Sequence, residues 1–175
     1  VLVVAIDVPY QLWNTKRQLK MTKQEVKDES KEQEGNPEVK GQIRRKQMEM
    51  AQQRMMDEVP KADVIVTNPS HYAVALKYDP MGTGAPIVMA KGIDVIAAQI
   101  RNIAMSKDIP LVAAPPLARA LFYSTEIGEE IPHGLFLAVA QVLAYVFQLK
   151  AAVENRTEKP IPPRDLKVPG EFRQQ

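Results

Sequence analysis

The feature that most constrains the fold is the alternation of short apolar runs with helix-periodic segments between Val59 and Lys150. Runs of β-branched residues bounded by turn residues predict strands, and apolar residues recurring every three or four positions predict helices. The pattern predicts strands at residues 62–68, 71–78, 87–92 and 110–114, and helices at residues 93–108, 115–125 and 135–150. With a helix before the first strand, this alternation indicates an α/β fold: a small mixed four-stranded sheet surrounded by about four helices. The last helix is apolar almost all round, so we expect it to pack on several sides.

A long charged arm precedes this region. Residues 14–58 carry 11 Lys or Arg and 9 Asp or Glu, interleaved, which predicts a solvated helical linker. Gly35, Asn36 and Pro37 predict a break and a new helix start. In the second helix Ile43, Met48, Met55 and Met56 fall loosely at helical spacing, which predicts a seam packed on the domain.

The two ends of the chain differ from the middle. Residues 151–175 combine Pro160, Pro162, Pro163 and Pro169 with charges, which predicts an extended, flexible tail. Residues 1–13 form an apolar run that is too short to span a bilayer and is followed by a basic cluster. Two interpretations of that run stay open on the residues alone: the cut end of a membrane helix, or the amphipathic opening of a soluble domain.

The composition of the chain excludes several kinds of site. The sequence has no cysteine, and no His, Asp or Glu grouping has metal-ligand spacing. The net charge is only +2, which argues against a nucleic-acid partner. No glycine-rich loop follows a strand and opens a helix, so a phosphate site is not expected. We therefore expect neither cofactor nor metal, and no nucleic acid.

The stretch TNPSHY, residues 67–72, offers a different chemistry. Pro69 has no N–H and favours an extended Asn68, so we expect the hairpin to open there. In that geometry the Asn68 side-chain nitrogen can attack its own carbonyl carbon and expel the Pro69 nitrogen, which cuts the chain. His71 can take or give the proton, and Ser70 can orient the loop or bond the developing oxyanion. The alternative is that Asn-Pro is only a turn starter.

Longer motifs surround this stretch: VPKADVIVTNPSHYAVALKYD, APIVMAKG, APPLARALF, EIGEEIP and the final helix. Together they resemble the FlhB/YscU-type family of autocleaving export-gate proteins of bacterial type III secretion, and they lean to its flagellar branch. The resemblance implies a protein of the bacterial inner membrane with residues 59–150 as a cytoplasmic domain that cuts itself between Asn68 and Pro69, once, without being a turnover enzyme. It implies that His71 assists and that the cut switches the class of exported protein. Ser70 stands where the family has threonine, which removes a stiffening β-branch.

The resemblance also implies partners: the other export-gate subunits, exported flagellar proteins, the hook-length control protein, and the membrane through residues 1–13. A docking patch for exported proteins is expected at Ala85, Pro86, Ala140 and Leu143, with packed core as the competing interpretation. Pro86 opens a strand without an N–H, and the two helical residues lie three apart on one face. The alternative function is a docking module for substrates or chaperones of an injectisome export apparatus that does not cleave.

Overall fold

The computed structural model describes residues 10–17, 37–79, 84–158, 160–163 and 166–172. The chain divides into two units, residues 1–50 and residues 51–175, and the second contains the sheet.

The sheet has four strands in the order β3-β2-β1-β4. Their bounds are β1 Val64–Asn68, β2 Tyr72–Lys77, β3 Ile87–Ile93 and β4 Leu111–Ala113. The β1–β2 and β2–β3 pairs are antiparallel, and β1–β4 is parallel. The sheet is mixed and four-stranded, as the sequence predicted. Strands β1 and β2 are its inner strands, and β1, which pairs with β2 and with β4, is called the central strand below.

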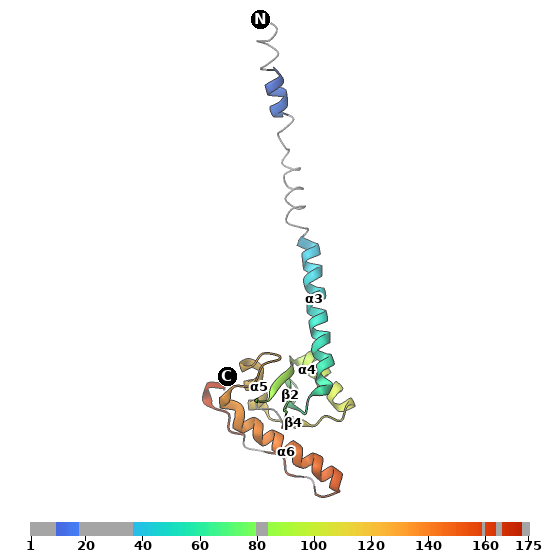
Figure 1. Cartoon of the computed structure of the whole chain (residues 1–175), viewed down its shortest axis with the longest axis vertical. Helices are drawn as coiled ribbons and strands as arrows, with labels where there is room; N and C mark the ends of the chain where they lie inside the picture. The colour runs from blue at the N-terminus through green and yellow to red at the C-terminus, as the bar shows by residue number, and fades with distance from the viewer. Residues whose placement is uncertain (1–9, 18–36, 80–83, 159, 164–165, 173–175) are drawn as a thin grey trace. The chain divides into compact units, whose positions relative to one another are not determined.

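Helices cover both faces of this sheet (Figure 1). Helix α4 (Asp94–Ser106) packs on one face, around Ile65 and Ile100, together with the short 3-10 helix η1 (Val59–Lys61). Helices α5 (Pro115–Ser124) and α6 (Phe136–Asn155) pack on the other face around Val66 and Leu121, with the 3-10 helix η2 (His133–Leu135). Burial on both faces explains why β1 begins with a continuous apolar run, Val64, Ile65 and Val66, without alternation.

Three expectations about the helices need correction. Helix α6 buries one side only, because its outer residues, including Leu137 and Val153, are exposed. It also runs to Asn155, five residues beyond the predicted end. Of the expected methionine seam, Met55 and Met56 pack against the α4 core, whereas Ile43 and Met48 are exposed.

The expected flexible tail is folded back in the parts that the structure describes. Val168 is buried in the core under α5 and α6, and Leu166 and Phe172 pack against the same core. The 3-10 helix η3 (Gly170–Phe172) ends this segment. The physical reason is that apolar side chains between the prolines can be buried without regular structure, so prolines alone do not predict a free tail.

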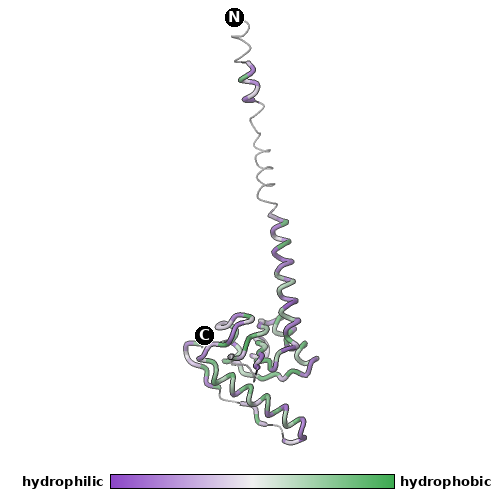
Figure 2. The backbone as a smooth tube through the Cα atoms, viewed as in Figure 1, coloured by the Kyte–Doolittle hydropathy of each residue, from purple (hydrophilic) through white to green (hydrophobic). Residues whose placement is uncertain are grey.

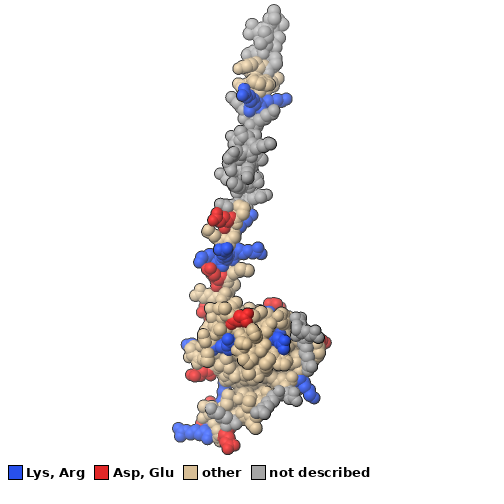
Figure 3. All heavy atoms as spheres, turned by 180° about the vertical axis from the view of Figure 1, so that it is seen from behind, with Lys and Arg blue, Asp and Glu red and all other residues tan. Residues whose placement is uncertain are grey.

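Helix α3 (Pro37–Glu58) begins at the proline that was predicted to start it, has 22 residues, and buries none of them. Figure 2 colours most of it as hydrophilic, and Figure 3 shows charges of both signs along it. Residues 10–17 are also helical, with the Arg17 guanidinium 5.4 Å from the centroid of the Trp13 ring. The rest of the predicted arm, including Gly35 and Asn36, and residues 1–9 of the predicted membrane segment lie outside the described residues.

Candidate functional site

Asn68 and His71 are the ends of a tight turn that joins the central strand β1 to β2. The His71 main-chain N–H donates a hydrogen bond to the Asn68 carbonyl oxygen over 2.8 Å, and Asn68 still pairs with Tyr72 in the sheet. Pro69 and Ser70 are the two central residues, and Ser70 has no positive φ, so the turn resembles type I. The expectation of an open hairpin was wrong. Proline is favoured at the second position of such a turn because the closing bond uses the N–H of the fourth residue.

The His71 ring is held by an aspartate from another element. Its Nδ1 lies 3.0 Å from the Asp94 Oδ1, at the first residue of α4. The Asp94 main-chain N–H also donates to the His71 carbonyl oxygen over 2.8 Å. Both side chains are 65% exposed, so the pair is open to solvent.

Aromatic side chains support the turn from the side of α5. The Tyr72 and Tyr123 hydroxyl oxygens are 3.1 Å apart. The centroids of the Tyr72 and Phe122 rings are 5.3 Å apart, and the rings pack edge to face. The hydrogen bond with Tyr123 raises the pKa of Tyr72 above its usual value of 10.0, and partial burial acts in the same direction. The first residue of β2 is thus held against α5 directly after His71.

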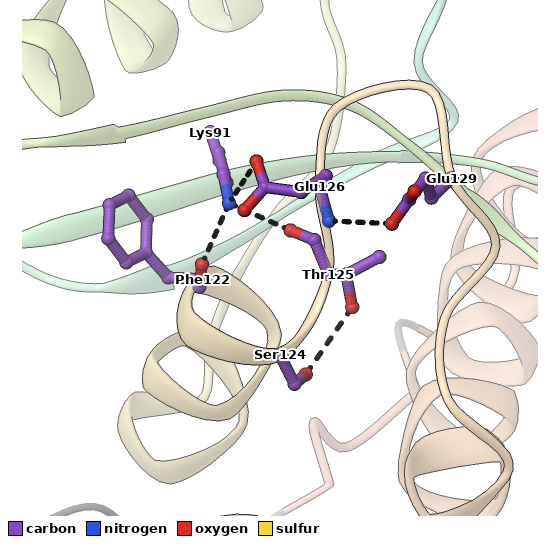
Figure 4. A network of polar contacts seen from close by, with 6 residues as sticks. All are labelled: Lys91, Phe122, Ser124, Thr125, Glu126 and Glu129. Carbon is purple, nitrogen blue, oxygen red and sulfur yellow. Dashed lines mark hydrogen bonds and ion pairs between the residues drawn. The ribbon is translucent and has the colours of Figure 1, made fainter.

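Lys91 fixes the end of α5 that carries those aromatic rings (Figure 4). Its ammonium donates to the carbonyl oxygens of Phe122 and Thr125 over 3.1 and 2.9 Å and pairs with the Glu126 carboxylate at 3.1 Å. The Lys91 side chain is only 13% exposed. Because the last carbonyl groups of a helix have no partner within the helix, this lysine satisfies them and ties α5 to β3.

The structure brings the four predicted residues Asn68, Pro69, Ser70 and His71 together in one turn. Pro69 and Ser70 are exposed, and Asn68 is half-buried. The donor on the Asn68 carbonyl oxygen is the His71 N–H, where sequence reasoning had suggested the Ser70 hydroxyl. Sequence reasoning missed Asp94, which is the second residue of the predicted helix 93–108. Pairing residues 71–78 with residues 87–92 as a hairpin would have brought it to the turn.

The predicted docking residues lie around a surface hollow of about 290 Å³ on another part of the same domain. Pro86, Ala140 and Leu143 line it, whereas Ala85 is half-buried against the α5–α6 core. Ala140 is exposed and Leu143 is buried, so the set is neither wholly surface nor wholly core. The hollow has further lining residues that sequence reasoning missed: Tyr78, Phe136, Ala144 and Phe147. The i, i+4 spacing of Ala140 and Ala144 and the i, i+7 spacing to Phe147 are the signals that extend the patch along α6.

The described part of the chain holds no group of three or more His, Asp or Glu that could bind a metal ion. One described helix, His133–Asn155, which comprises η2 and α6, is long and apolar enough to cross a bilayer. Residues Val139, Val142 and Val146 of that helix pack in the core of the sheet, which accounts for its apolar character in a folded domain.

Solved structures show the class of domain: the fold is that of the FlhB cytoplasmic domain and the EscU C-terminal domain. The structure is similar to the cytoplasmic domain of FlhB from Shewanella putrefaciens, with a TM-score of 0.66 and 53% identity over 70% of this chain and 95% of that one. It is also similar to an EscU C-terminal domain carrying an asparagine-to-aspartate mutation, with a TM-score of 0.50 and 35% identity over 53% of this chain and 98% of that one.

The family follows from the sequence. Residues 1–146 match the model of the FlhB HrpN YscU SpaS family, and the chain belongs to that family. It is 50% identical over 167 residues to the flagellar biosynthetic protein FlhB of Salmonella typhimurium and 52% identical over 167 residues to that of Yersinia enterocolitica. In both cases the match covers 95% of this chain and 44% of the relative, so the chain spans less than half the length of these relatives.

Proposed function

We propose that the protein is a component of the bacterial flagellar export gate in the inner membrane, with residues 59–150 as a cytoplasmic domain. The domain cleaves itself once between Asn68 and Pro69, and the cut controls which class of flagellar protein is exported. Support comes from family membership, from the flagellar relatives, and from the geometry of the turn. The proposed partners are the other export-gate subunits, exported flagellar proteins and the hook-length control protein.

The reaction is an asparagine cyclisation. The Asn68 Nδ2 attacks the Asn68 carbonyl carbon and loses one proton to a base, which gives a tetrahedral oxyanion in a five-membered ring. The carbon–nitrogen bond to Pro69 then breaks, and the Pro69 nitrogen leaves as a secondary amine after taking up a proton. The products are a succinimide at the new C-terminus and a free Pro69, with no water consumed until the succinimide hydrolyses. His71 supplies both proton transfers and ends unchanged.

The observation that carries this proposal is the hydrogen bond from the His71 N–H to the Asn68 carbonyl oxygen. That oxygen belongs to the bond to be cut, and it carries the negative charge of the tetrahedral intermediate. A main-chain donor already aimed at it at 2.8 Å stabilises that charge without reorganisation. Asn68 is held at the end of the central strand, so the reacting atoms have few other conformations to adopt.

Cleavage tests the proposal on a denaturing gel. Freshly translated chain is expected to give two fragments whose new ends are Asn68 and Pro69, identified by mass, at a rate that does not change on wide dilution. Asn68→Ala abolishes the cut and Pro69→Ala slows it, whereas Asn102→Ala, which removes an exposed asparagine from α4, leaves it unchanged. Full cleavage of the Asn68→Ala chain would remove the cyclisation mechanism.

The switch itself acts through local change around residues 67–72, because the strands on both sides remain paired by contacts that do not involve the cut bond. Hydrogen exchange on the cleaved protein and on Asn68→Ala protein is expected to differ at this turn and at its neighbour Asp94. Deprotection throughout β1 and β2 in the cleaved form would exclude the local explanation.

A second candidate function is docking of exported proteins in the hollow lined by Pro86, Ala140 and Leu143. The observation that favours it is that aromatic and small apolar side chains surround an open space beside α6, which suits a short apolar segment of a partner. This function is compatible with cleavage. A domain that docks partners but gives no fragments on the gel would favour the alternative of a docking module that does not cleave.

A further inference from the structure

We propose that Asp94 is a positioning residue for the cut: it holds the His71 ring so that its Nε2 is free to take the proton from Asn68. The inference rests on the proposed self-cleavage and concerns a residue outside the turn. Asp94 acts through His71 and is not expected to touch the reacting atoms.

The contact fixes the tautomer of the histidine. An ionised carboxylate only accepts hydrogen bonds, so the His71 Nδ1, 3.0 Å from the Asp94 Oδ1, carries the proton of that contact. In the neutral ring the Nε2 then has the free lone pair. A proton-accepting nitrogen that is oriented by a third group is the arrangement that general-base chemistry uses.

Asp94 holds His71 at two points. Its carboxylate contacts the ring, and its main-chain N–H donates to the His71 carbonyl oxygen over 2.8 Å. His71 in turn donates its own N–H to the Asn68 carbonyl oxygen. The ring, the main chain of His71 and the bond to be cut are therefore linked through three contacts.

The backbone of Asp94 is also unusual. Its φ is 45°, in the left-handed region that residues with a side chain seldom adopt, although Asp and Asn adopt it more readily than others. The preceding Ile93 is extended and gives no side-chain cap to α4. The conformation directs the Asp94 carboxylate back to the turn, at the junction of β3 and α4.

A purely structural explanation is that an acidic residue in the first turn of α4 stabilises the helix. The exposure of the pair argues that its contribution to folding is small, since exposed ion pairs are weak. The two explanations differ in what happens once His71 is gone. If Asp94 only stabilises the fold, Asp94→Ala slows the cut further in a chain that already carries His71→Ala. If Asp94 acts through the His71 ring, Asp94→Ala has no further effect in that chain.

The chain offers a matched control. Asp108 is another exposed aspartate with a positive φ, 55°, and it lies just beyond the far end of α4. Asp108→Ala removes the same type of side chain from a residue that also has a positive φ, close to the other end of the same helix. It changes nothing near the turn.

The experiment measures cleavage rates in full chain made by cell-free translation and sampled over time on denaturing gels. His71→Ala is expected to slow the cut about 10²–10⁴-fold, the usual range for removal of a general base, and Asp94→Ala about tenfold or more. The double variant is expected to be as slow as His71→Ala alone, because effects on one chain of contacts do not add. Asp108→Ala cleaves at the parental rate, and Asp94→Asn, which keeps an oxygen acceptor and suits a positive φ, retains part of the rate.

A second measurement does not depend on cleavage. The sequence has only two histidines, so ¹⁵N spectra of the uncut Asn68→Ala chain identify His71 by comparison with a His133→Gln variant. In mildly alkaline buffer, where a histidine ring is neutral, we expect the proton on Nδ1. Adding Asp94→Ala shifts the population to the Nε2-protonated form, and adding Asp108→Ala does not.

The outcomes distinguish an error about Asp94 from an error about self-cleavage. If the parent chain is cut but Asp94→Ala cleaves at the parental rate, or if the two substitutions add fully, the inference about Asp94 is wrong and the cleavage proposal stands. If the parent chain is not cut, the cleavage proposal is wrong, and the role of Asp94 in it falls too. A His71 ring with Nε2 protonated in the uncut parent background would overturn the orientation directly.

Discussion

The proposed cut between Asn68 and Pro69 would leave the central strand on the shorter fragment, and we expect both fragments to remain one folded unit. Fragment 1–68 contributes Val59, Val64, Ile65 and Val66, all fully buried, to the cores on both faces of the sheet. Complete burial of such a side chain contributes about 1.5–3 kcal/mol, so the four together contribute about 6–12 kcal/mol, an upper value.

Main-chain hydrogen bonds add to that figure. Strand β1 pairs with β2 on one side and with β4 on the other, and each bond contributes about 0.5–1.5 kcal/mol net. Holding two fragments together at micromolar concentration requires about 8 kcal/mol after the cost of association. The burial and pairing of β1 together exceed this value before the cost of association is subtracted, and their upper values also cover an association cost of about 4–15 kcal/mol.

Native size exclusion is expected to give one peak from protein that runs as two bands on a denaturing gel. A sharper assay is the melting temperature of cleaved protein, because unfolding then also separates two chains and depends on concentration. A tenfold dilution shifts the equilibrium by about 1.4 kcal/mol, which lowers the midpoint by about 3–6 °C for a domain of this size. The uncut Asn68→Ala protein melts independently of concentration and serves as the control. Two separate peaks without denaturant, or a melting midpoint of fully cut protein that does not change on dilution, would refute the prediction that the two fragments remain one folded unit.

Four further changes have defined outcomes. Ala140→Asp is expected to change the free energy of unfolding in urea by no more than about 0.5 kcal/mol, because the residue is exposed, while weakening the binding of exported proteins in calorimetry; a large loss of stability would instead mean a buried position. Leu76→Ala, at a fully buried position, is expected to cost about 2–5 kcal/mol in urea unfolding, and a cost below 1 kcal/mol, smaller than this range allows, would contradict its place in the core. Lys91→Met leaves two carbonyl oxygens at the end of α5 without their donor and is expected to cost about 1–3 kcal/mol, whereas unchanged stability would exclude that function. The pKa of Tyr72 is raised in the folded protein by its contact with Tyr123, so the stabilisation is complete below pH 10.0 and is lost as the pH rises through the folded value; Tyr72→Phe is expected to remove this part of an alkaline unfolding curve, and an identical curve would contradict it.

The fold was largely predictable because its strands are buried on both faces. A continuous apolar run such as residues 64–66 can be assigned to a strand without knowing which face of the sheet is covered. The predicted strands match the observed ones to within two residues at each end. Helix α6 was harder for the same reason. An almost uniformly apolar helix carries no pattern that tells its buried side from its exposed side, so packing on several sides was the natural expectation and was wrong.

The turn was predictable in place but not in geometry. Sequence reasoning treated the missing N–H of Pro69 as a break in the ladder, whereas the turn closes through the N–H of His71. The position of Asp94 beside His71 depends on the register between β2 and β3. That register cannot be read from either strand alone. Val168 was missed because an extended segment between prolines has no periodicity from which burial can be inferred.

The order of strands in the sheet has a consequence for how the protein is made. Strand β2 pairs with β1 and with β3, its neighbours in sequence, whereas β4 pairs with β1 but follows it in the sequence only after β2, β3 and α4. Local hairpins form before distant pairings, because closing a long loop costs more entropy. We therefore expect the turn at Asn68 and Pro69, the proposed site of the cut, to be present in a growing chain before β1 has its second neighbour. A mixed α/β domain of this size folds within milliseconds to seconds, so a slow cut falls after β4 has docked. A fast cut would release a strand from an unfinished sheet, and slowness is thus a condition for the cleaved product to be native.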